Sequence, residues 1–417
     1  MATVDDATAQ HTHPGPLRHN RDFWLLWGGQ AISQLGSQVS NLALPLLILA
    51  LTNSPAQAGL IAALQRLPYL VLGLPAGALV DRWDRKAVMI ACDALRCVVY
   101  GSIPLAAGVG QLYPAQFYFV ALLGGGALVF FDAADNASFP RVVPPAHLPR
   151  ATAVMESTNA FMDLLGPGLG GVLVSLGRTI VAGAAFAYAA DSLSYLASAI
   201  SLVAIQVPFQ AERAGGTARS SLRADITVGI DFLRRHRRLR TLAAFNTGVL
   251  LLIGPASLAV IVLAHGALRA DARTIGLIFA LGGAGGLVGA LAMPMVQARL
   301  RVGQTLIGAV LVWLLSMVLL AVAPSPAFLV VGWAFVTVVN PIYFTTLYAY
   351  RVTLIPDELQ GRVNSVFRLL AFVGSAVGPA IGGILLGPLG PRLELGLSGL
   401  GLGLCIVAVA RTDVRKV

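Results

Sequence analysis

The sequence has few charged residues for its length. Only 12% of its 417 residues are Asp, Glu, Lys or Arg, whereas 57% are hydrophobic and the mean hydropathy is +0.78. A soluble domain carries about 25% charged residues. This deficit excludes a water-exposed globular surface, so most of the outer surface is expected to face lipid.

The sequence also has few cysteines and lacks the common nucleotide-binding motif. The three cysteines, Cys92, Cys97 and Cys405, lie in apolar segments and form no CxxC pair, which argues against a disulfide scaffold and a thiolate metal site. The sequence contains no GxxxxGK[ST] motif, so ATP is not expected to drive the protein. We therefore expect no cofactor and no metal, and interpret the histidines of the N-terminal tail as solvated.

Long apolar runs are what the sequence has in quantity. Blocks of about 18–25 residues, each long enough to cross a bilayer as a helix, alternate with charged or Pro/Gly-rich breaks. They predict an all-α membrane protein with twelve transmembrane helices in two pseudo-symmetric six-helix bundles. The expected spans are 23–50, 57–80, 87–107, 115–136, 151–177, 181–206, 241–265, 273–296, 303–322, 326–350, 361–387 and 392–411.

These spans divide the chain into five parts. An N-terminal tail (1–22) and a C-terminal tail (412–417) flank two bundles (23–206 and 241–411), which a polar linker (207–240) joins. The N-terminal tail is polar and has no short apolar core followed by a cleavage site, so no cleaved signal peptide is expected.

The basic residues are distributed unevenly between alternate loops. One set contains DRWDRK, PRVVPPAHLPR, the linker, ARLRVG and RVTLIPDELQGR, whereas the other set carries only Arg178, Arg269, Arg273 and Arg392. Cytoplasmic loops of membrane proteins retain Lys and Arg. The pattern predicts a multi-pass protein of the cell membrane with both termini in the cytoplasm. It also explains the net charge of +10 without a nucleic-acid partner.

The linker contains an amphipathic pattern followed by arginines. Leu222, Ile226, Ile230 and Leu233 fall on one face of a helix, and five arginines lie within residues 234–240. Such a helix is typical of an inner membrane surface, where arginines contact anionic head groups. We therefore expect anionic lipids as partners of the linker.

A short pattern occurs twice, half a chain apart. GPGLGG begins at Gly166 and GPAIGG begins at Gly378, and similar loops precede both. The repeat predicts two halves that arose by duplication, as in transporters with parallel repeats. Small residues let helices approach closely, and proline can bend them. The expected packing and gating residues are Gly166, Pro167, Gly170, Gly171, Gly378, Pro379 and Gly382; ordinary packing without gating is the alternative.

The loop between the second and third spans, GLPAGALVDRWDRKAVMIACDALR (73–96), carries a family resemblance. It resembles the signature loop of the major facilitator superfamily, with Asp84 in place of a usual glycine. DSLSYLASA (191–199) and GIDFLRRHRRLRTL (229–242) are similar to the branch of enterobactin and macrolide exporters. The resemblance implies a proton-coupled exporter working by alternating access. The matching loop residues are Gly77, Asp81, Arg82, Arg85 and Lys86.

Asp81 is a candidate for a contact between the halves. We expect its carboxylate to face the start of the eleventh span near Gly361, because a helix N-terminus favours an anion. Arg362 would stand close by. Such a latch would hold the cytoplasmic side closed and break when that side opens; a loop that only sets topology is the alternative.

Acidic residues inside spans are costly and usually functional. Asp163 lies midway along the fifth span, on the same helical face as Glu156 and Gly166. We expect it to take and release a proton, with Glu156 and Asp132 as further candidates. Asp191 is interpreted as part of a packing motif. Asp93 and Arg96 are interpreted as an intrahelical pair, and Arg66 and Arg368 as lone basic residues near span ends.

Neutral polar residues in spans suggest a central cavity for a largely apolar ligand. The first span carries Ser37 where related proteins often have an acid, so its polar groups are amides. The expected cavity residues are Gln34, Gln38, Asn41, Asp135, Asn246, Asn340 and Tyr343.

The sequence therefore predicts a secondary active, proton-coupled exporter of an amphipathic organic molecule, acting as a monomer. A membrane-embedded prenyl or acyl transferase is an alternative of a different class, suggested by DAAD at 132–135; magnesium dependence would favour it. An uptake or lipid-handling protein is a third possibility.

Overall fold

The computed structural model describes residues 17–210 and 222–412. The predictions for most of the N-terminal tail, for the middle of the linker and for residues 413–417 concern parts of the chain outside these ranges. The described residues include nine helices that are long and apolar enough to cross a membrane.

The first half contains six long helices that follow the expected spans to within a few residues. Asn20, Ser54, Asp84 and Thr179 cap four of them, each side chain accepting a hydrogen bond from a backbone N–H of the first turn. Side-chain caps of this kind define helix starts. The helices are α1 (Arg21–Thr52), α2 (Pro55–Val80), α3 (Arg85–Gly108), α4 (Pro114–Val142), α5 (Leu148–Ser175) and α6 (Ile180–Ala204), with short turns η1 (Leu17–His19) and η2 (Pro145–His147).

The second half differs from the expected spans in two places. The predicted span 241–265 is not one helix, since it breaks at Gly254 and Pro255, where proline removes a backbone donor. The last two spans join in one element that reverses direction at Gly390, whose φ of 75° suits glycine. The elements are α7 (Leu222–Arg235), α8 (Arg237–Ile253), α9 (Ala256–Val262), a π-helical turn η3 (Leu263–Ala267), α10 (Ala272–Arg299), α11 (Val302–Ala321), α12 (Pro326–Leu354), η4 (Asp357–Leu359) and α13 (Gln360–Ala410).

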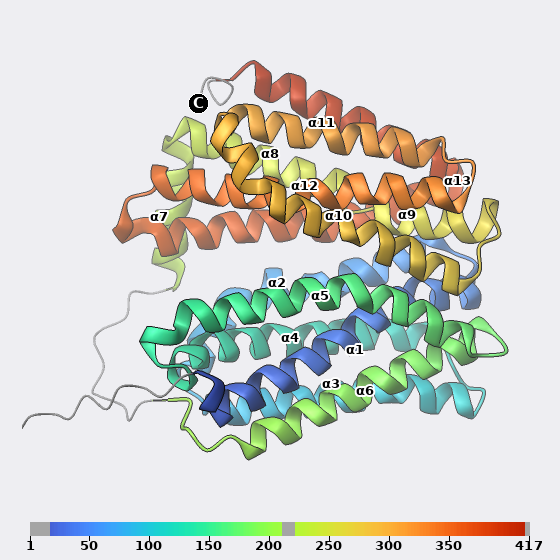
Figure 1. Ribbon diagram of the computed structural model, residues 1–417, viewed down its shortest axis with the longest axis horizontal. Coiled ribbons are helices and arrows are strands. Elements are labelled where there is room, and N and C mark those ends of the chain that lie inside the picture. Colours follow the sequence, from blue (N-terminus) through green and yellow to red (C-terminus); the bar gives the residue numbers. More distant parts are fainter. Residues whose placement is uncertain (1–16, 211–221, 413–417) are drawn as a thin grey trace, which may run out of the picture.

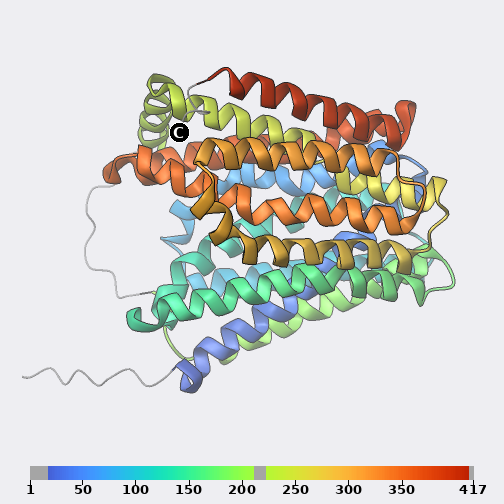
Figure 2. The same ribbon diagram turned by 45° about the horizontal axis from the view of Figure 1, so that its top comes forward.

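The helices form two bundles that lie side by side. In Figures 1 and 2 the first half, blue to green, lies below the second half, yellow to red. The bundles meet mainly where α2 packs on the first part of α13 and where α5 packs on α10. The continuous segment α8–α9–η3 runs once along the length of the bundle, and α13 runs along it twice. Each half therefore contributes six spans, which confirms the prediction of an all-helical protein with twelve spans.

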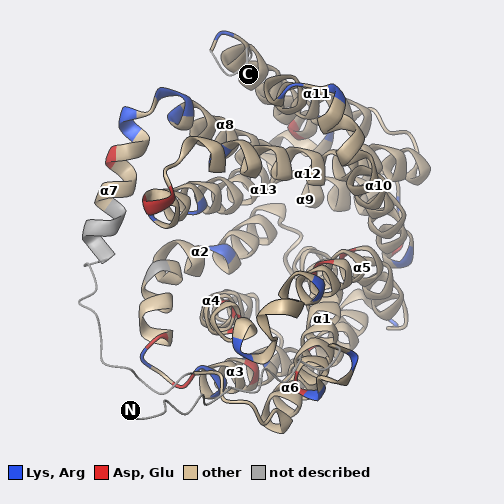
Figure 3. Ribbon diagram, turned by 60° about the vertical axis from the view of Figure 1, so that its left-hand side comes forward, with Lys and Arg blue, Asp and Glu red and all other residues tan. Residues whose placement is uncertain are grey.

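Charge separates the two ends of the bundle. One end, here the Arg-rich end, carries the α2–α3 loop and α7, and both ends of the described chain lie there (Figure 1). Figure 3, which brings that end forward, shows ribbon segments coloured as Lys or Arg on α7 and at helix ends, while the long spans are mostly coloured as uncharged. The opposite, charge-poor end carries the starts of α2 and α10. There, Asp271 caps α10, and the hydrogen bonds it accepts from Thr274 lower its pKa.

Candidate functional site

The two copies of the glycine motif occupy equivalent positions in the two halves. Gly166 and Gly170 of α5 lie against Gln38 and Val39 of α1, within the first half. Gly378 and Gly382 of α13 lie against α8 and α9, within the second half. In each copy these glycines therefore pack the motif helix onto a neighbour of its own bundle.

The last glycine of each copy faces the other half instead. A Cβ atom added to Gly171 would lie 2.8 Å from Cα of Gly276 on α10, and one added to Gly383 would lie 2.8 Å from Cα of Gly59 on α2. Such distances leave no room for any side chain. The two glycine pairs bring the bundles into backbone contact toward the charge-poor end.

A cavity of about 530 Å³ lies between the two halves on the Arg-rich side of these pairs. We call it the central cavity. Its first-half wall carries the polar groups Gln38, Asn41, Gln65 and Arg66, and both motif prolines reach it. The second-half wall is mostly apolar and aromatic, with three neutral polar side chains. Its residues include Leu250, Ile253, Ser257, Phe279, Trp333, Asn340, Phe344 and Ser375.

A second cavity, of about 650 Å³, lies between α2, α4 and α13 at the Arg-rich end. We call it the end cavity. Tyr69 of α2 stacks on Phe372 of α13 with ring centroids 4.6 Å apart, and both residues line the end cavity. Asp132 also lines it and accepts a hydrogen bond from the Tyr69 hydroxyl. At this end the halves therefore touch through the Tyr69–Phe372 ring pair, beside a cavity with a partly polar lining.

Asp163 of α5 lies against α1, where Gln38 and Gln34 donate hydrogen bonds to its Oδ1 atom, the latter over 3.4 Å. The carboxylate is exposed at the inner surface of the first half, and Glu156 is exposed farther along α5 toward the Arg-rich end. Gln38 also lines the central cavity, so one amide joins the acid to that cavity.

The signature loop (73–96) makes polar contacts with other helices of the first half at the Arg-rich end. Asp81 forms an ion pair with Arg85 at 3.1 Å, and Arg85 also donates to the carbonyl oxygen of Ala137 on α4 over 2.8 Å. Lys86 donates to the carbonyl oxygens of Val203 and Ile205 at the end of α6. Gly77 and Asp81 line the end cavity, across from Arg368 of α13, whereas Arg82 is exposed and Arg362 is half-buried.

Several predicted cavity residues lie elsewhere. Asn246 and Tyr343 are buried inside the second half, where the Tyr343 hydroxyl lies 3.4 Å from Asn246 Oδ1. Asp135 binds Gln30 of α1. These three side chains point into bundle interiors, because a hydropathy pattern locates a span but does not fix which polar face turns to the centre.

Two arginines that sequence analysis set aside line cavities. Arg66 lines the central cavity, and Arg368 lines the end cavity. Neither was expected at the site, since each was interpreted as a basic residue near a span end. Their signal in the sequence is a lone basic residue within an apolar run, which is costly unless it faces a polar space.

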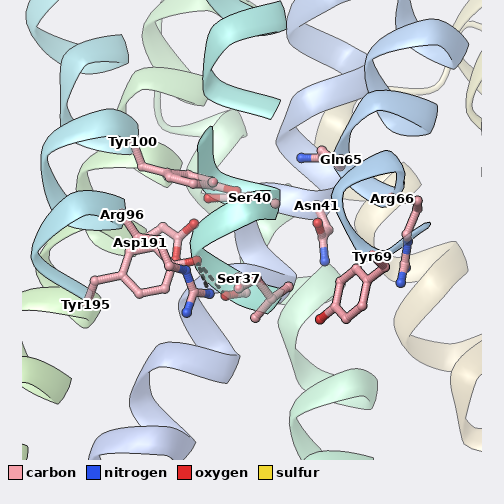
Figure 4. A pocket seen from close by; sticks show the side chains of 13 residues that line it. Ser37, Ser40, Asn41, Gln65, Arg66, Tyr69, Arg96, Tyr100, Asp191 and Tyr195 are labelled. Carbon is pink, nitrogen blue, oxygen red and sulfur yellow. Dashed lines mark hydrogen bonds between the residues drawn. The ribbon is translucent and has the colours of Figure 1, made fainter. Parts of the chain in front are cut away.

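A third, smaller cavity of about 110 Å³ lies inside the first half (Figure 4). We call it the polar cavity. Asn41, Gln65 and Arg66 line both it and the central cavity. Figure 4 shows Arg96 and Asp191 on the side away from Arg66. The remaining lining includes Ser37, Ser40, Tyr69, Tyr100 and Tyr195.

Comparisons with known proteins agree with this architecture. Residues 12–415 match the family described as transmembrane secretion effector. The chain is 30% identical to the multidrug efflux pump Tap of Mycobacterium tuberculosis over 390 residues, 91% of this chain and 90% of that protein. It is 24% identical to macrolide efflux protein A of Streptococcus pyogenes over 225 residues, 54% of each chain.

Solved structures share the fold at low identity. The nucleoside transporter NupG superposes with a TM-score of 0.75 at 12% identity, covering 94% of this chain and 99% of that one. With a family match over nearly the whole chain and twelve spans in two halves, the chain belongs to the transmembrane secretion effector family of major facilitator efflux transporters, which are not enzymes.

Proposed function

We propose that this protein exports an amphipathic, largely apolar organic molecule in exchange for protons, by alternating access across the cell membrane. The observation that carries the proposal is the central cavity, which is bounded toward one end by the two glycine pairs and followed toward the other by the end cavity. A site between two repeated halves, accessible from one side at a time, is what alternating access requires.

The substrate class follows from the cavity walls. A volume of about 530 Å³ is within the range that holds drug-sized ligands. Phe279, Trp333 and Phe344 offer aromatic surface on one wall, while Gln38 and Asn41 offer amide hydrogen bonds on the other. A molecule with an apolar body and a few polar groups matches both walls. Relatives named as multidrug and macrolide efflux proteins support the same class.

The orientation follows from charge. Because cytoplasmic loops retain Lys and Arg, the Arg-rich end is the cytoplasmic end and both termini are cytoplasmic. The end cavity then opens the protein toward the cytoplasm, and the glycine pairs bound the central cavity toward the outside. This is the state in which an exporter collects its substrate. The basic helix α7 would lie at the inner leaflet, where its arginines contact anionic lipids.

Protons are the proposed driving ion, and Asp163 is the proposed acid of the substrate path. Its carboxylate is bound by Gln34 and Gln38, and Gln38 also lines the central cavity. A substrate that occupies the cavity would compete for the same amides, which links substrate binding to the acid. Glu156 and Asp132 are secondary candidates, and a monomer contains every residue used here.

The alternatives receive less support. The two aspartates of DAAD have different partners, since Asp132 binds Tyr69 and Asp135 binds Gln30. They therefore do not converge as ligands of one diphosphate-bound metal. Uptake would use the same cavities as export, so a measurement of the direction of transport distinguishes the two.

The test is growth of a pump-deficient bacterial host that expresses this chain, challenged with amphipathic antibiotics and dyes. We expect resistance to at least one compound, its loss in the presence of a protonophore, and its loss in Asp163→Asn. Glu358→Gln, an exposed change on η4, is the matched control and should keep resistance at equal expression. Resistance that survives the protonophore would contradict proton coupling, and increased sensitivity would point to uptake.

A further inference from the structure

Three charged side chains are buried together inside the first half, away from the central cavity. Asp93 and Arg96 come from α3, and Asp191 comes from α6. Both carboxylates are 0% exposed and the guanidinium side chain is 6% exposed. Charges buried this deeply need partners or a function.

The contacts of Arg96 do not satisfy both acids. Arg96 forms an ion pair with Asp93 at 3.6 Å, donates to the Tyr195 hydroxyl over 2.8 Å, and lies 3.9 Å from the centre of the Tyr195 ring. Both carboxylate oxygens of Asp93 are buried and make no hydrogen bond. Asp191 Oδ1 accepts a hydrogen bond of 3.4 Å from Ser194, whereas its Oδ2 atom is buried and makes none.

The cluster therefore holds two acids and one base. One guanidinium neutralises one carboxylate, so charge balance in this apolar surrounding requires that one of the two acids carry a proton. Asp191 is the acid that can exchange a proton with water, because it lines the polar cavity whereas Asp93 does not. A metal cation is disfavoured there, since the neighbouring guanidinium already supplies the positive charge.

The polar cavity connects Asp191 to the substrate path. Its volume of about 110 Å³ has room for several water molecules, each of which needs roughly 10–15 Å³ of such space. Asn41, Gln65 and Arg66 line both this cavity and the central one, and Tyr69 lines both this cavity and the end cavity. A proton can thus reach Asp191 through polar groups from either larger cavity.

The surroundings of Asp191 contain few other titratable groups. Its own helix contributes Tyr188 and Tyr195, and α1 contributes only hydroxyls, Ser37 and Ser40. Asp163 of α5 is turned toward α1, where it binds two glutamines. The further charged or titratable groups around the cavity are Asp93, Arg96 and Tyr100 of α3 and Arg66 and Tyr69 of α2.

Helix α1 lies between this cluster and the acid of the substrate path. Ser37 Oγ lies 2.8 Å from the Tyr195 hydroxyl, which in turn accepts the hydrogen bond from Arg96. Gln34 and Gln38, on another side of α1, bind Asp163. A change in the charge of Asp191 would move Arg96 and Tyr195, and through Ser37 it would reach α1.

We propose that Asp191, which is buried beside the Arg96–Asp93 ion pair, is a second proton-binding site, and that its occupancy sets the balance between the two access states through α1. The proposal rests on the proton exchange of the proposed function. With the proton bound, Arg96 stays with Asp93 and Tyr195. When the proton leaves to water in the polar cavity, the ionised Asp191 attracts Arg96 and the α1–α3–α6 contacts change. Asp191 acts by positioning α1 and does not touch the substrate.

The test measures conformation without substrate, in full-length protein reconstituted into liposomes. The three native cysteines are replaced, and Ser365→Cys in the end cavity reports access to a polar maleimide. Because maleimide reacts with the thiolate, each labelling rate is divided by the rate of the detergent-denatured protein at the same pH. We expect this ratio to change with pH in the wild type, to be independent of pH in Asp191→Asn, and to keep its pH dependence in Asp163→Asn. Substrate counterflow, which needs no net proton movement, should persist in Asp191→Asn while proton-driven accumulation is lost.

The outcomes separate the two proposals. Wild-type transport that neither depends on pH nor is abolished by a protonophore would contradict the proposed function. Proton-driven wild-type transport with an Asp191→Asn variant that keeps its pH-dependent labelling would overturn only the inference about Asp191. If Asp191→Asn does not fold, Asp191→Glu provides a second test. The pH at which its labelling is half-maximal should differ from that of the wild type, and an unchanged value would overturn the inference.

Discussion

At the scale of single residues, the same side chain has different roles according to its position on a helix. Asp84 caps α3 by accepting a hydrogen bond from Ala87 N–H, and Asp271 caps α10 in the same way. Asp81 ends α2 and pairs with Arg85. Asp163 is bound by two glutamines of α1 and Asp191 lines the polar cavity, and these are the two acids that we propose to bind protons.

Asp81 is expected to act as a latch when the cytoplasmic side closes. Asp81 lines the end cavity opposite α13, which contributes Ser365 and Arg368 to the lining. Asp81→Asn removes a charge-assisted contact of about 1.5 kcal/mol, which corresponds to roughly a tenfold change in the balance of states. We expect transport to fall by about that factor, with Ser365→Cys labelled faster than in the wild type.

The control for this prediction is Glu358→Gln, which removes a charge on the same end of the molecule. It should leave transport and labelling unchanged. If Asp81→Asn also leaves both unchanged at equal expression, the loop serves topology alone and the latch hypothesis is wrong.

The sequence identified which residues are polar within spans but not always where they point. Gln38 and Asn41 line the central cavity, whereas Asn246 and Tyr343 are buried against each other. All four are amides or hydroxyls in apolar runs, and their local patterns are alike. The difference arises from how each helix is rotated in its bundle, which depends on contacts with distant segments.

At the scale of helices, α5 and α13 each use one motif for two contacts. The first glycines of the motif hold the helix against its own bundle, and the last glycine meets the other bundle. Under the proposed alternating access, the contact between bundles is expected to open while the packing within each bundle is kept. The motif would then combine both kinds of contact within six residues.

Gly276 tests the reversible contact. A Cβ atom there would lie 2.6 Å from the carbonyl oxygen of Pro167 and 2.8 Å from Gly171 Cα, so Gly276→Ala overpacks the contact by about 1–3 kcal/mol. We expect the charge-poor end to open more often. Ser257→Cys in the central cavity should then react faster with an impermeant maleimide added outside.

Gly286→Ala is the matched control on the same helix. Its Cβ atom would lie 3.8 Å from the nearest neighbour, the carbonyl oxygen of Thr337, which is ordinary contact. Labelling in this variant should equal that of the parent. Equal labelling in Gly276→Ala as well would mean that the glycine contact only supports packing.

At the scale of the whole molecule, the two halves have the same fold but different chemistry. In the described chain, the first half buries Asp22, Asp93, Arg96 and Asp191, whereas the second half buries Glu394 as its charged side chain. The sequence predicted the duplication, because the motif and its loop recur. The sequence did not predict how the buried charges are divided between the halves, because contacts such as Arg96–Tyr195 join residues that are 99 positions apart in the chain.

The proposed alternating access requires that the two halves move relative to each other. Gly73 of α2 and Ser365 of α13 both line the end cavity, one from each half. Cysteines at these two positions should form a disulfide only when the cytoplasmic end closes. We expect oxidation to trap that state and stop transport, and reduction to restore it, as followed by substrate flux in liposomes.

The partner variant for this experiment carries the cysteines at Gly73 and Ala133, which lie on α2 and α4 of the same half and line the same cavity. A disulfide within one half should leave transport unaffected, because each bundle moves as a unit. Transport that stops with this pair, or continues with the Gly73–Ser365 pair fully oxidised, would show that the motion occurs within a bundle.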